Sequence, residues 1–416
     1  MLRSSTRSSG LAAGWRPWLR FTVVAAWGLV LVVPGADAQS TISRKDIDVQ
    51  RARNRMVEAR GAQPQYSERW DLRDLPEYKP EQRVSGTIRM WGLNYLADCQ
   101  LARYWEDGFR KYHPDIQFDY HLKSALAAIP ALVTGVGDIG ASRHITFDEL
   151  LDFQRYFNDQ PLELVMATGS YNVPGWANAL GIFVHQKNPI SKITFKQLDG
   201  VFGAQRTGGY EGLTWIPARG RSADGNIRTW GQLGLTGEWA DKPIHVYGLN
   251  LKYHQQLDIE RKVFHGGDKW NEDLREYSNY ANADGSLAIA AQELMKDLSN
   301  DPYGIAYSGP QNITPETKLL SLSEKDNGPF VELNMQTVRN RTYPLFGEEY
   351  WYARREPGKP MDPKVKEYLL YVLSRQGQED VQRDAHFLPL TAKVSSEQIK
   401  KLERDDRNIS GRVAQH

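Results

Sequence analysis

Short apolar strands and amphipathic helices alternate along most of the chain. Residues 86–91 predict a strand, residues 101–112 carry apolar side chains at helical spacing, and residues 116–120 alternate as a second strand does. A helix over 127–133 and a short buried strand over 137–141 follow. Strands separated by helices form parallel sheets through right-handed crossovers. The order therefore predicts an α/β fold.

The same alternation continues toward the C-terminus. Further strands are predicted over 162–166, 180–185, 244–248 and 304–307, and further helices over 194–202, 287–298, 362–376 and 395–402. Asp362 is expected to cap the third of these helices, with Pro363 in its first turn. Residues 377–381 either continue that helix or begin another. Nearer the N-terminus, residues 44–60 suit a polar helix and residues 61–80 are typical of a linker.

The N-terminus has the pattern of a secretory signal peptide. Four arginines precede an apolar run over 21–33, which is short for a membrane span, and Ala36-Asp37-Ala38 follows as a cleavage site. We expect the chain to be exported, with an uncleaved anchor as the less favoured alternative. Residue 39, directly after the cleavage point, is glutamine and not cysteine, so no lipoprotein anchor is expected. No later segment is apolar for long enough to span a membrane.

Charge and cysteine content exclude several classes of protein. The 416 residues include 52 basic and 51 acidic side chains. Residues 1–38 hold four arginines and one aspartate, so their removal changes the formal charge from +1 to −2. A nucleic-acid-binding protein usually carries a basic excess. The single cysteine, Cys99, excludes an intrachain disulfide and cysteine metal clusters, and it is expected to be buried and inert.

Sequence patterns of common enzymes are not found. The chain has no phosphate-binding P-loop, no dinucleotide-binding glycine motif, no nucleophile elbow and no His-Glu-x-x-His pair. Glu348 and Glu349 are interpreted as a solvated surface pair, and residues 221–226 as a surface turn. We therefore expect neither an enzyme nor a bound cofactor or metal.

Several strings, taken in order, carry a family resemblance over residues 84–393. They occupy residues 179–190, 194–202, 229–239, 243–248, 301–309, 343–345, 357–363, 374–378 and 388–390. Together they resemble the periplasmic phosphate-binding proteins of ABC importers, which have the type II periplasmic binding protein fold. The resemblance implies two α/β lobes with a ligand cleft between them. It also implies a monomer that binds a small oxyanion and meets the membrane subunits of an ABC transporter.

The expected organisation divides the chain into six parts. These are a signal peptide (1–38), a polar lead-in (39–83), a first part of lobe 1 (84–185), lobe 2 (186–303), a second part of lobe 1 (304–400) and a polar tail (401–416).

The resemblance places the ligand-binding residues in loops that follow strands. The candidates are Asn94, Tyr95, Ser124, Ser142, Arg143, Asn250 and Ser286. Serine, arginine and helix N-terminal amides donate hydrogen bonds to oxyanions. For Ser142 and Arg143 a purely structural role in a turn is the alternative. Ser286 is expected to act with the amides of a helix that begins beside it.

The fourth anion-binding loop departs from the family pattern. The expected Ser-Gly-Thr string is replaced by bulky residues at 253–255, and Lys252 and His254 are the candidate replacements for the lost donors. Bulky side chains oppose the close backbone approach that glycine allows. Three functions follow: an oxyanion-binding protein, a diverged binding protein with another ligand or a sensor role at the cell envelope, and, least favoured, a phosphatase.

Overall fold

The computed structural model describes residues 44–403, in which the strands form two five-stranded mixed sheets. The first sheet has the order β2-β1-β3-β16-β4. Its strands are β1 (Gly86–Gly92), β2 (Ile116–His121), β3 (Ile139–Ser142), β4 (Leu162–Thr168) and β16 (Glu348–Ala353). Strands β1, β2 and β3 are parallel, and β16 is antiparallel to both of its neighbours. The proposed signal peptide and residues 404–416 of the tail lie outside the described residues.

The second sheet repeats this topology with the order β10-β9-β13-β5-β14. Its strands are β5 (Gly181–His185), β9 (His245–Leu249), β10 (Arg275–Tyr277), β13 (Gly304–Ser308) and β14 (Thr317–Leu319). Here β9, β10 and β13 are parallel, and β5 is antiparallel to β13 and β14. The expected lobe boundaries at 185 and 303 assigned β5, β13 and β14 to lobe 1. That assignment is wrong, because all three strands pair within the second sheet.

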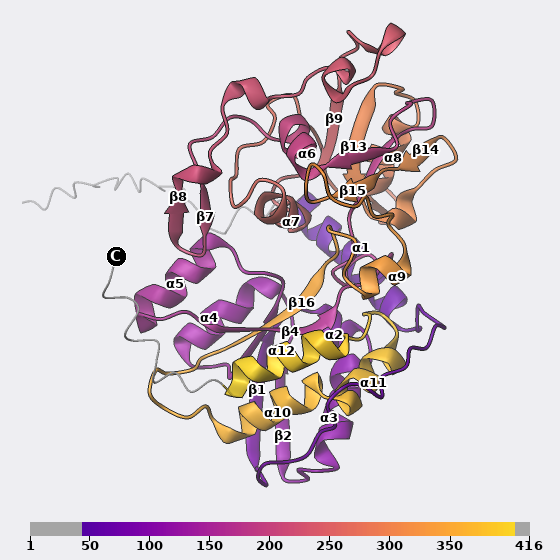
Figure 1. Ribbon diagram of the computed structural model, residues 1–416. Helices are drawn as coiled ribbons and strands as arrows, with labels where there is room; N and C mark the ends of the chain where they lie inside the picture. The colour runs from indigo at the N-terminus through magenta and orange to yellow at the C-terminus, as the bar shows by residue number, and fades with distance from the viewer. Residues whose placement is uncertain (1–43, 404–416) are drawn as a thin grey trace, which may run out of the picture. The chain divides into compact units, whose positions relative to one another are not determined.

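Helices connect and cover the strands of each sheet (Figure 1). They are α1 (Arg44–Gly61), α2 (Tyr95–Asp98), α3 (Leu101–Arg110), α4 (Ala128–Thr134), α5 (Phe147–Phe157), α6 (Phe195–Phe202), α7 (Gln255–Lys262), α8 (Ala290–Leu298), α9 (Met335–Arg339), α10 (Pro363–Leu373), α11 (Arg375–Asp384) and α12 (Ala392–Glu403). No described helix is both long and apolar enough to cross a membrane.

Short elements complete the described chain. The short strands are β6 (Lys192–Thr194), β7 (Gly209–Glu211), β8 (Thr214–Ile216), β11 (Tyr280–Ala281), β12 (Leu287–Ala288) and β15 (Ser321–Ser323). The 3₁₀ turns are η1 (Ala125–Ala127), η2 (Pro217–Arg219), η3 (Ala223–Gly225), η4 (Trp230–Leu233), η5 (Gly237–Trp239) and η6 (Pro310–Asn312). Strands β7 and β8 form one hairpin, and β11 and β12 form another.

Local capping explains where several helices begin. The Asp362 side chain accepts from the Lys364 amide, and Pro363 lies in the first turn of α10, as the sequence predicts. A helix does not run through to residue 376. Instead Ser374 ends α10 and caps α11, with its hydroxyl accepting from the Gly377 amide at 3.4 Å. Helix α5, which the sequence analysis did not predict, begins with a capping box between Thr146 and Glu149.

The chain crosses between the two sheets twice, over 169–180 and 340–347, and the crossings lie side by side. The Gly169 amide donates to the Gly347 carbonyl at 2.9 Å, and the Tyr343 hydroxyl donates to the Leu180 carbonyl at 2.8 Å. A Cβ atom on Gly169 or on Gly347 would lie 2.0 Å from the Ala177 carbonyl oxygen. Glycine is therefore required at both positions for this close approach. The two crossing segments together are called the hinge region.

The segment interpreted as a linker is packed against the protein. Between residues 61 and 80, Tyr66, Leu72, Leu75 and Tyr78 are all buried. The Tyr78 hydroxyl lies 2.7 Å from Oε2 of Glu367 on α10, so a polar network also holds the segment. Apolar burial of this kind opposes free linker motion, and the prediction of a linker is wrong.

The predicted surface pair at 348–349 is also wrong. Both residues belong to β16, where Glu349 is buried and Glu348 forms an ion pair of 2.8 Å with Arg341. Burial raises the pKa of the Glu349 carboxyl well above its usual value. Cys99 is buried, as expected. The predicted turn at 221–226 contains η3, and Arg221 at its start pairs with Asp199 at 3.2 Å.

Candidate functional site

Loops from three parallel strands of the first sheet meet at one edge. Because β1, β2 and β3 are parallel, their carboxyl ends and the loops that follow share that edge. The Leu93 amide donates to the Ala141 carbonyl at 2.9 Å, and the Ser142 hydroxyl donates to the Ala125 carbonyl at 3.3 Å. The structure thus brings the first three predicted loops together.

The first loop becomes the start of α2. The Asn94 side chain donates to Oδ2 of Asp98 at 2.6 Å. Tyr95 is buried with its ring centroid 5.0 Å from that of Trp176, and its hydroxyl accepts from Nη2 of Arg53 at 2.7 Å. Both candidates therefore lie at the loop edge. Tyr95 also contacts Arg53, which the sequence analysis did not select.

The two serine candidates have structural partners. The Ser124 hydroxyl accepts from the Leu126 amide at 3.3 Å and so caps η1, while its side chain is exposed. Ser142 is fully buried, and its hydroxyl is engaged by the Ala125 carbonyl. Of the two, Ser124 has the more accessible hydroxyl.

Arg143 has the position of an anion donor but already holds a carboxylate. Its Nη1 lies 3.0 Å from Oε2 of Glu149, and both side chains are largely buried. The same nitrogen donates to the His144 carbonyl at 3.3 Å. Since Glu149 is fixed by the capping box of α5, the ion pair fixes the guanidinium at the loop edge.

The second sheet contributes the loop between β9 and α7. Asn250 uses its side chain on its own loop, donating to Oγ of Ser278 at 3.0 Å and accepting from the Lys252 amide at 3.0 Å. The Lys252 side chain is exposed. His254 is the residue before the first turn of α7 and makes no side-chain cap. The bulky fourth loop therefore ends in a histidine at a helix N-terminus.

The His254 imidazole lies in a positive environment. Burial, followed by the charge of Arg143, lowers its pKa to about 4; Asp258 opposes the shift, and Arg53 adds to it. His254 is therefore neutral near pH 7. Tyr350 on β16 pairs with Ser142 and lies beside Arg261 of α7, so the loop after β3 and helix α7 approach one another here.

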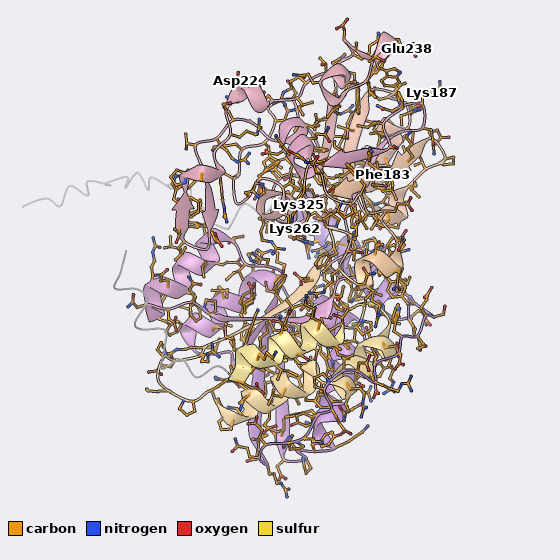
Figure 2. The ribbon with its side chains drawn as sticks, in the orientation of Figure 1. Phe183, Lys187, Asp224, Glu238, Lys262 and Lys325 are labelled. Atoms are coloured by element: carbon orange, nitrogen blue, oxygen red, sulfur yellow. The ribbon has the colours of Figure 1, made fainter. Side chains whose placement is uncertain are left out.

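The remainder of α7 faces elements of the first sheet and of the hinge. Nζ of Lys262 donates to the carbonyls of Pro344 at 3.1 Å and Phe346 at 2.7 Å, and Figure 2 labels Lys262 between the elements of the two sheets. The Arg261 guanidinium lies 5.9 Å from the ring centroid of Tyr350 on β16. Arg261 also pairs with Asp258 at 3.0 Å. Helix α7 is thus one part of the second lobe that meets the first.

Ser286 is not at a helix start, so that prediction is wrong. It lies in the turn of the β11–β12 hairpin, and its hydroxyl donates to Oδ1 of Asp284 at 2.6 Å. Helix α8 begins four residues later, at Ala290. The sequence signal of an aspartate, a glycine and a serine marks a hairpin turn here.

One buried group has the residue types of a metal site. Ligand atoms of Cys99, Asp384 and His386 lie within 4.8 Å of one another. Nδ1 of His386 is 3.0 Å from Oδ2 of Asp384, and its Nε2 is 3.3 Å from the Arg60 carbonyl. Burial, with the charge of Asp384, raises the pKa of the Cys99 thiol well above its usual value, which disfavours the thiolate that a metal requires.

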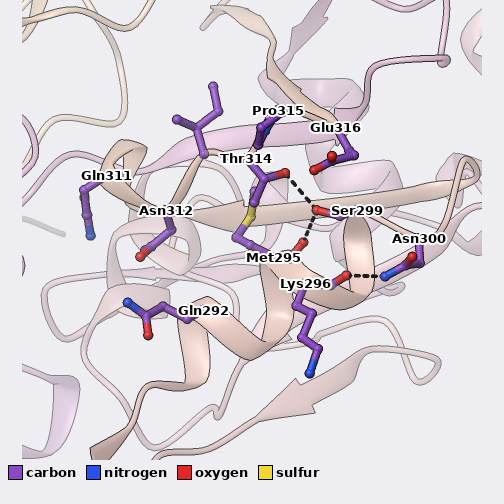
Figure 3. A pocket seen from close by; sticks show the side chains of 11 residues that line it. Gln292, Met295, Lys296, Ser299, Asn300, Gln311, Asn312, Thr314, Pro315 and Glu316 are labelled. Atoms are coloured by element: carbon purple, nitrogen blue, oxygen red, sulfur yellow. Dashed lines mark hydrogen bonds between the residues drawn. The ribbon is translucent and has the colours of Figure 1, made fainter.

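A surface pocket of about 600 Å³ lies elsewhere, between α8 and the segment of η6 that leads to β14 (Figure 3). Its lining includes Gln292, Lys296, Asn300, Gln311, Asn312 and Glu316. The hydroxyls of Ser299 and Thr314 on its wall are 2.8 Å apart and bond to each other. Lys296 is the single basic residue of this lining.

Comparison with known proteins now decides the family. The family model described as a PBP superfamily domain matches residues 81–376. The chain belongs to the PBP superfamily. It is similar to the phosphate-binding protein PstS of Pseudomonas aeruginosa, with 32% identity over 329 residues that cover 79% of this chain and 90% of the relative.

Solved structures of low identity are also similar to this superfamily member. An ABC-type phosphate transport receptor from Vibrio cholerae is 16% identical, with a TM-score of 0.44, and covers 73% of this chain and 99% of its own. PstS from Borrelia burgdorferi is 15% identical, with a TM-score of 0.47, and covers 74% of this chain and 100% of its own.

Several charged residues of this region were missed by the sequence analysis. Arg53 lay in a segment interpreted only as a polar helix, and Arg261 and Lys262 lay beyond the loop that departs from the family pattern. Arg341 pairs with Glu348 and adopts a left-handed backbone with φ of 63°. The one available signal was the basic doublet at 261–262, which lies 12 and 13 residues after the end of β9.

Proposed function

We propose that this member of the PBP superfamily is a periplasmic solute-binding protein of an ABC-type importer, and that it binds phosphate or a related oxyanion. The observation that carries the proposal is the approach of α7 to the loop that holds Arg143. Tyr350 pairs with Ser142, next to Arg143, and its ring centroid lies 5.9 Å from the Arg261 guanidinium of α7. In the proposed cleft, a guanidinium from the first lobe and helix amides from the second bind one anion. The similarity to a phosphate-binding relative supports this choice of ligand.

The proposed mechanism is binding followed by closure. In the proposed cleft, Arg143 supplies charge, Asn94 and Ser124 supply hydrogen bonds, and α7 supplies the amides at its start. Rotation about the paired crossing segments then removes the anion from water and presents both lobes to the membrane subunits of the transporter. We propose that the protein acts as a monomer after removal of the signal peptide.

A diverged ligand is the second candidate, and the Arg143–Glu149 ion pair favours it. A guanidinium that is already paired offers fewer free donors to a phosphate than an unpaired one does. In this case the binding fold is kept and a different small molecule, or a partner at the cell envelope, occupies the same edge.

A thermal-shift screen of residues 39–416 separates the two candidates. A ligand that binds only the folded protein raises the melting temperature by mass action. Phosphate, sulfate and arsenate at millimolar concentration are expected to raise it, whereas amino acids and neutral sugars are not. A shift with one of the latter and none with the oxyanions would favour the diverged ligand.

A further inference from the structure

Helix α1 precedes the family domain, yet it contacts both lobes near the candidate site. Nη1 of Arg60 donates to the Pro174 carbonyl at 2.7 Å, within the first crossing segment. Nη2 of Arg55 donates to the Gly285 carbonyl at 2.7 Å, in the β11–β12 hairpin of the second lobe. Figure 1 shows α1, in indigo, between the elements of the two sheets. The helix is therefore positioned to contribute side chains to the region between them.

Arg53 is the α1 side chain that reaches the predicted ligand loops. Its Nη2 donates to the Tyr95 hydroxyl at 2.7 Å, and its guanidinium carbon lies 5.8 Å from the Tyr95 ring centroid. The side chain is half-buried. Tyr95 follows β1 directly, so Arg53 is held at the edge where the first three loops meet.

The charge of Arg53 is not neutralised by a carboxylate of the described chain. Arg143, Arg261 and Arg341 each pair with an acidic side chain at 3.0 Å or less. Among residues 48–403, Arg53 has no such ion pair, and its side-chain partner is a neutral phenol. A guanidinium has five N–H donors, so several remain for a ligand.

Helix α1 also holds Arg53 close to the second lobe, because Arg55 of the same helix contacts the β11–β12 hairpin. Arg53 is thus fixed by Tyr95 at the loop edge of the first lobe, on a helix that contacts both lobes. Its charge is also one of the influences that lower the pKa of His254, the residue before α7. A half-buried guanidinium that has no direct ion pair is stabilised by an anion that binds beside it.

We propose that Arg53 is a ligand-binding residue, which donates from outside the family domain to the oxyanion held between the loop after β3 and the start of α7. This inference rests on the proposed function. In this arrangement the planar guanidinium replaces donors that the small-residue fourth loop no longer supplies. The Tyr95 hydroxyl positions the guanidinium for that contact.

The test is calorimetric titration of residues 39–416 with inorganic phosphate and with sulfate. The variants are Arg53→Gln, Arg53→Lys and, as the matched control, Arg51→Ala, which removes an exposed arginine of the same helix. We expect Arg53→Gln to weaken binding by about tenfold or more, since it removes charge-assisted hydrogen bonds. Arg53→Lys keeps the charge, so an intermediate loss is expected, and Arg51→Ala is expected to bind as the wild type does.

The outcomes distinguish this inference from the proposed function. If the wild type binds and Arg53→Gln binds within twofold of it, Arg53 is not a ligand-binding residue and the function stands. An equal loss of affinity in Arg51→Ala would also overturn the inference, because the loss would then reflect the overall positive charge of the helix and not a contact made by Arg53. If the folded wild type binds neither anion, both proposals fall. Should Arg53→Gln fail to fold, the Arg53→Lys titration decides alone.

Discussion

Arg143 and Glu149 form an ion pair with 3.0 Å between Nη1 and Oε2, and this pair ties a predicted ligand residue to the start of a helix. The same carboxylate oxygen accepts from the Thr146 amide at 2.8 Å and closes the capping box of α5. A single glutamate therefore fixes both the helix and the guanidinium.

The first prediction follows from this shared carboxylate. Glu149→Ala removes the capping box and leaves the Arg143 guanidinium without its partner, so the free energy of unfolding should fall by about 1–2 kcal/mol. Denaturant unfolding measures the change. The control is Asp148→Ala, which alters an exposed acid one residue earlier. Equal stability of the two variants would contradict the role assigned to Glu149.

A second prediction concerns a buried charge cluster in the second lobe. Asp199 accepts from Arg206 at 2.7 Å through each of its oxygens and lies 3.2 Å from Arg221, with all three side chains largely buried. Asp199→Ala leaves two buried guanidinium groups uncompensated, at a cost of about 3–5 kcal/mol. Asp224→Ala, an exposed acid on η3, should change stability little. A small loss in Asp199→Ala, measured by denaturant unfolding, would contradict this account.

A third prediction concerns an aromatic contact between the lobes. Phe147 on α5 and Tyr210 on the β7–β8 hairpin have ring centroids 4.4 Å apart, and the Tyr210 amide is tied to the Gly266 carbonyl of the second lobe. If closure brings the lobes together on binding, this contact adds to affinity. Tyr210→Ala should then weaken phosphate binding by up to about tenfold.

The control for this contact is Tyr156→Ala, which removes a highly exposed ring from α5 itself. Both variants are compared with the wild type by calorimetry. An unchanged affinity in Tyr210→Ala would show that the ring contact does not depend on the ligand.

How far the sequence predicts this protein differs between fold and site. Most strands and helices were predicted, because apolar periodicity and caps such as Asp362 act locally. Strand β16 was missed, because two adjacent glutamates at its start, Glu348 and Glu349, are typical of a solvent-exposed loop. Only the tertiary structure supplies Arg341 as a partner and buries Glu349. The lobe boundaries at β5 and β13 failed because strand partners are set by topology, which periodicity does not report.

For the candidate site, the sequence located the loops and not the contacts. Arg143 lies where predicted, but the identity of its partner Glu149 depends on a helix that the pattern did not show. Ser286 was misplaced because a turn signal resembles a helix cap. Arg53 was missed for a different reason: it is brought to Tyr95 from 42 positions away, and no local pattern encodes that distance.

The fourth prediction concerns pH and the buried His386. Burial lowers its pKa, but the hydrogen bond and charge of Asp384 outweigh burial, and the pKa is raised overall. The imidazolium is therefore favoured by folding. Its contribution to stability is fully present below about pH 6.5 and is lost as the pH rises through the raised pKa of the folded state.

The measurement is the melting temperature of the wild type and of His386→Gln at pH 6 and at pH 9. The difference between the two proteins should be larger at pH 6, where the His386 side chain carries its charge between Asp384 and the Arg60 carbonyl. A difference that does not change with pH would show that the histidine is neutral in the folded protein.

The central claim is that the edge around Arg143 and the start of α7 binds an oxyanion, and its most direct test is calorimetric titration of residues 39–416 with inorganic phosphate. We predict saturable binding to one site, and we expect Arg143→Gln to lower the affinity for phosphate by about tenfold or more. A folded wild-type protein that gives no heat with millimolar phosphate at two temperatures would contradict the claim.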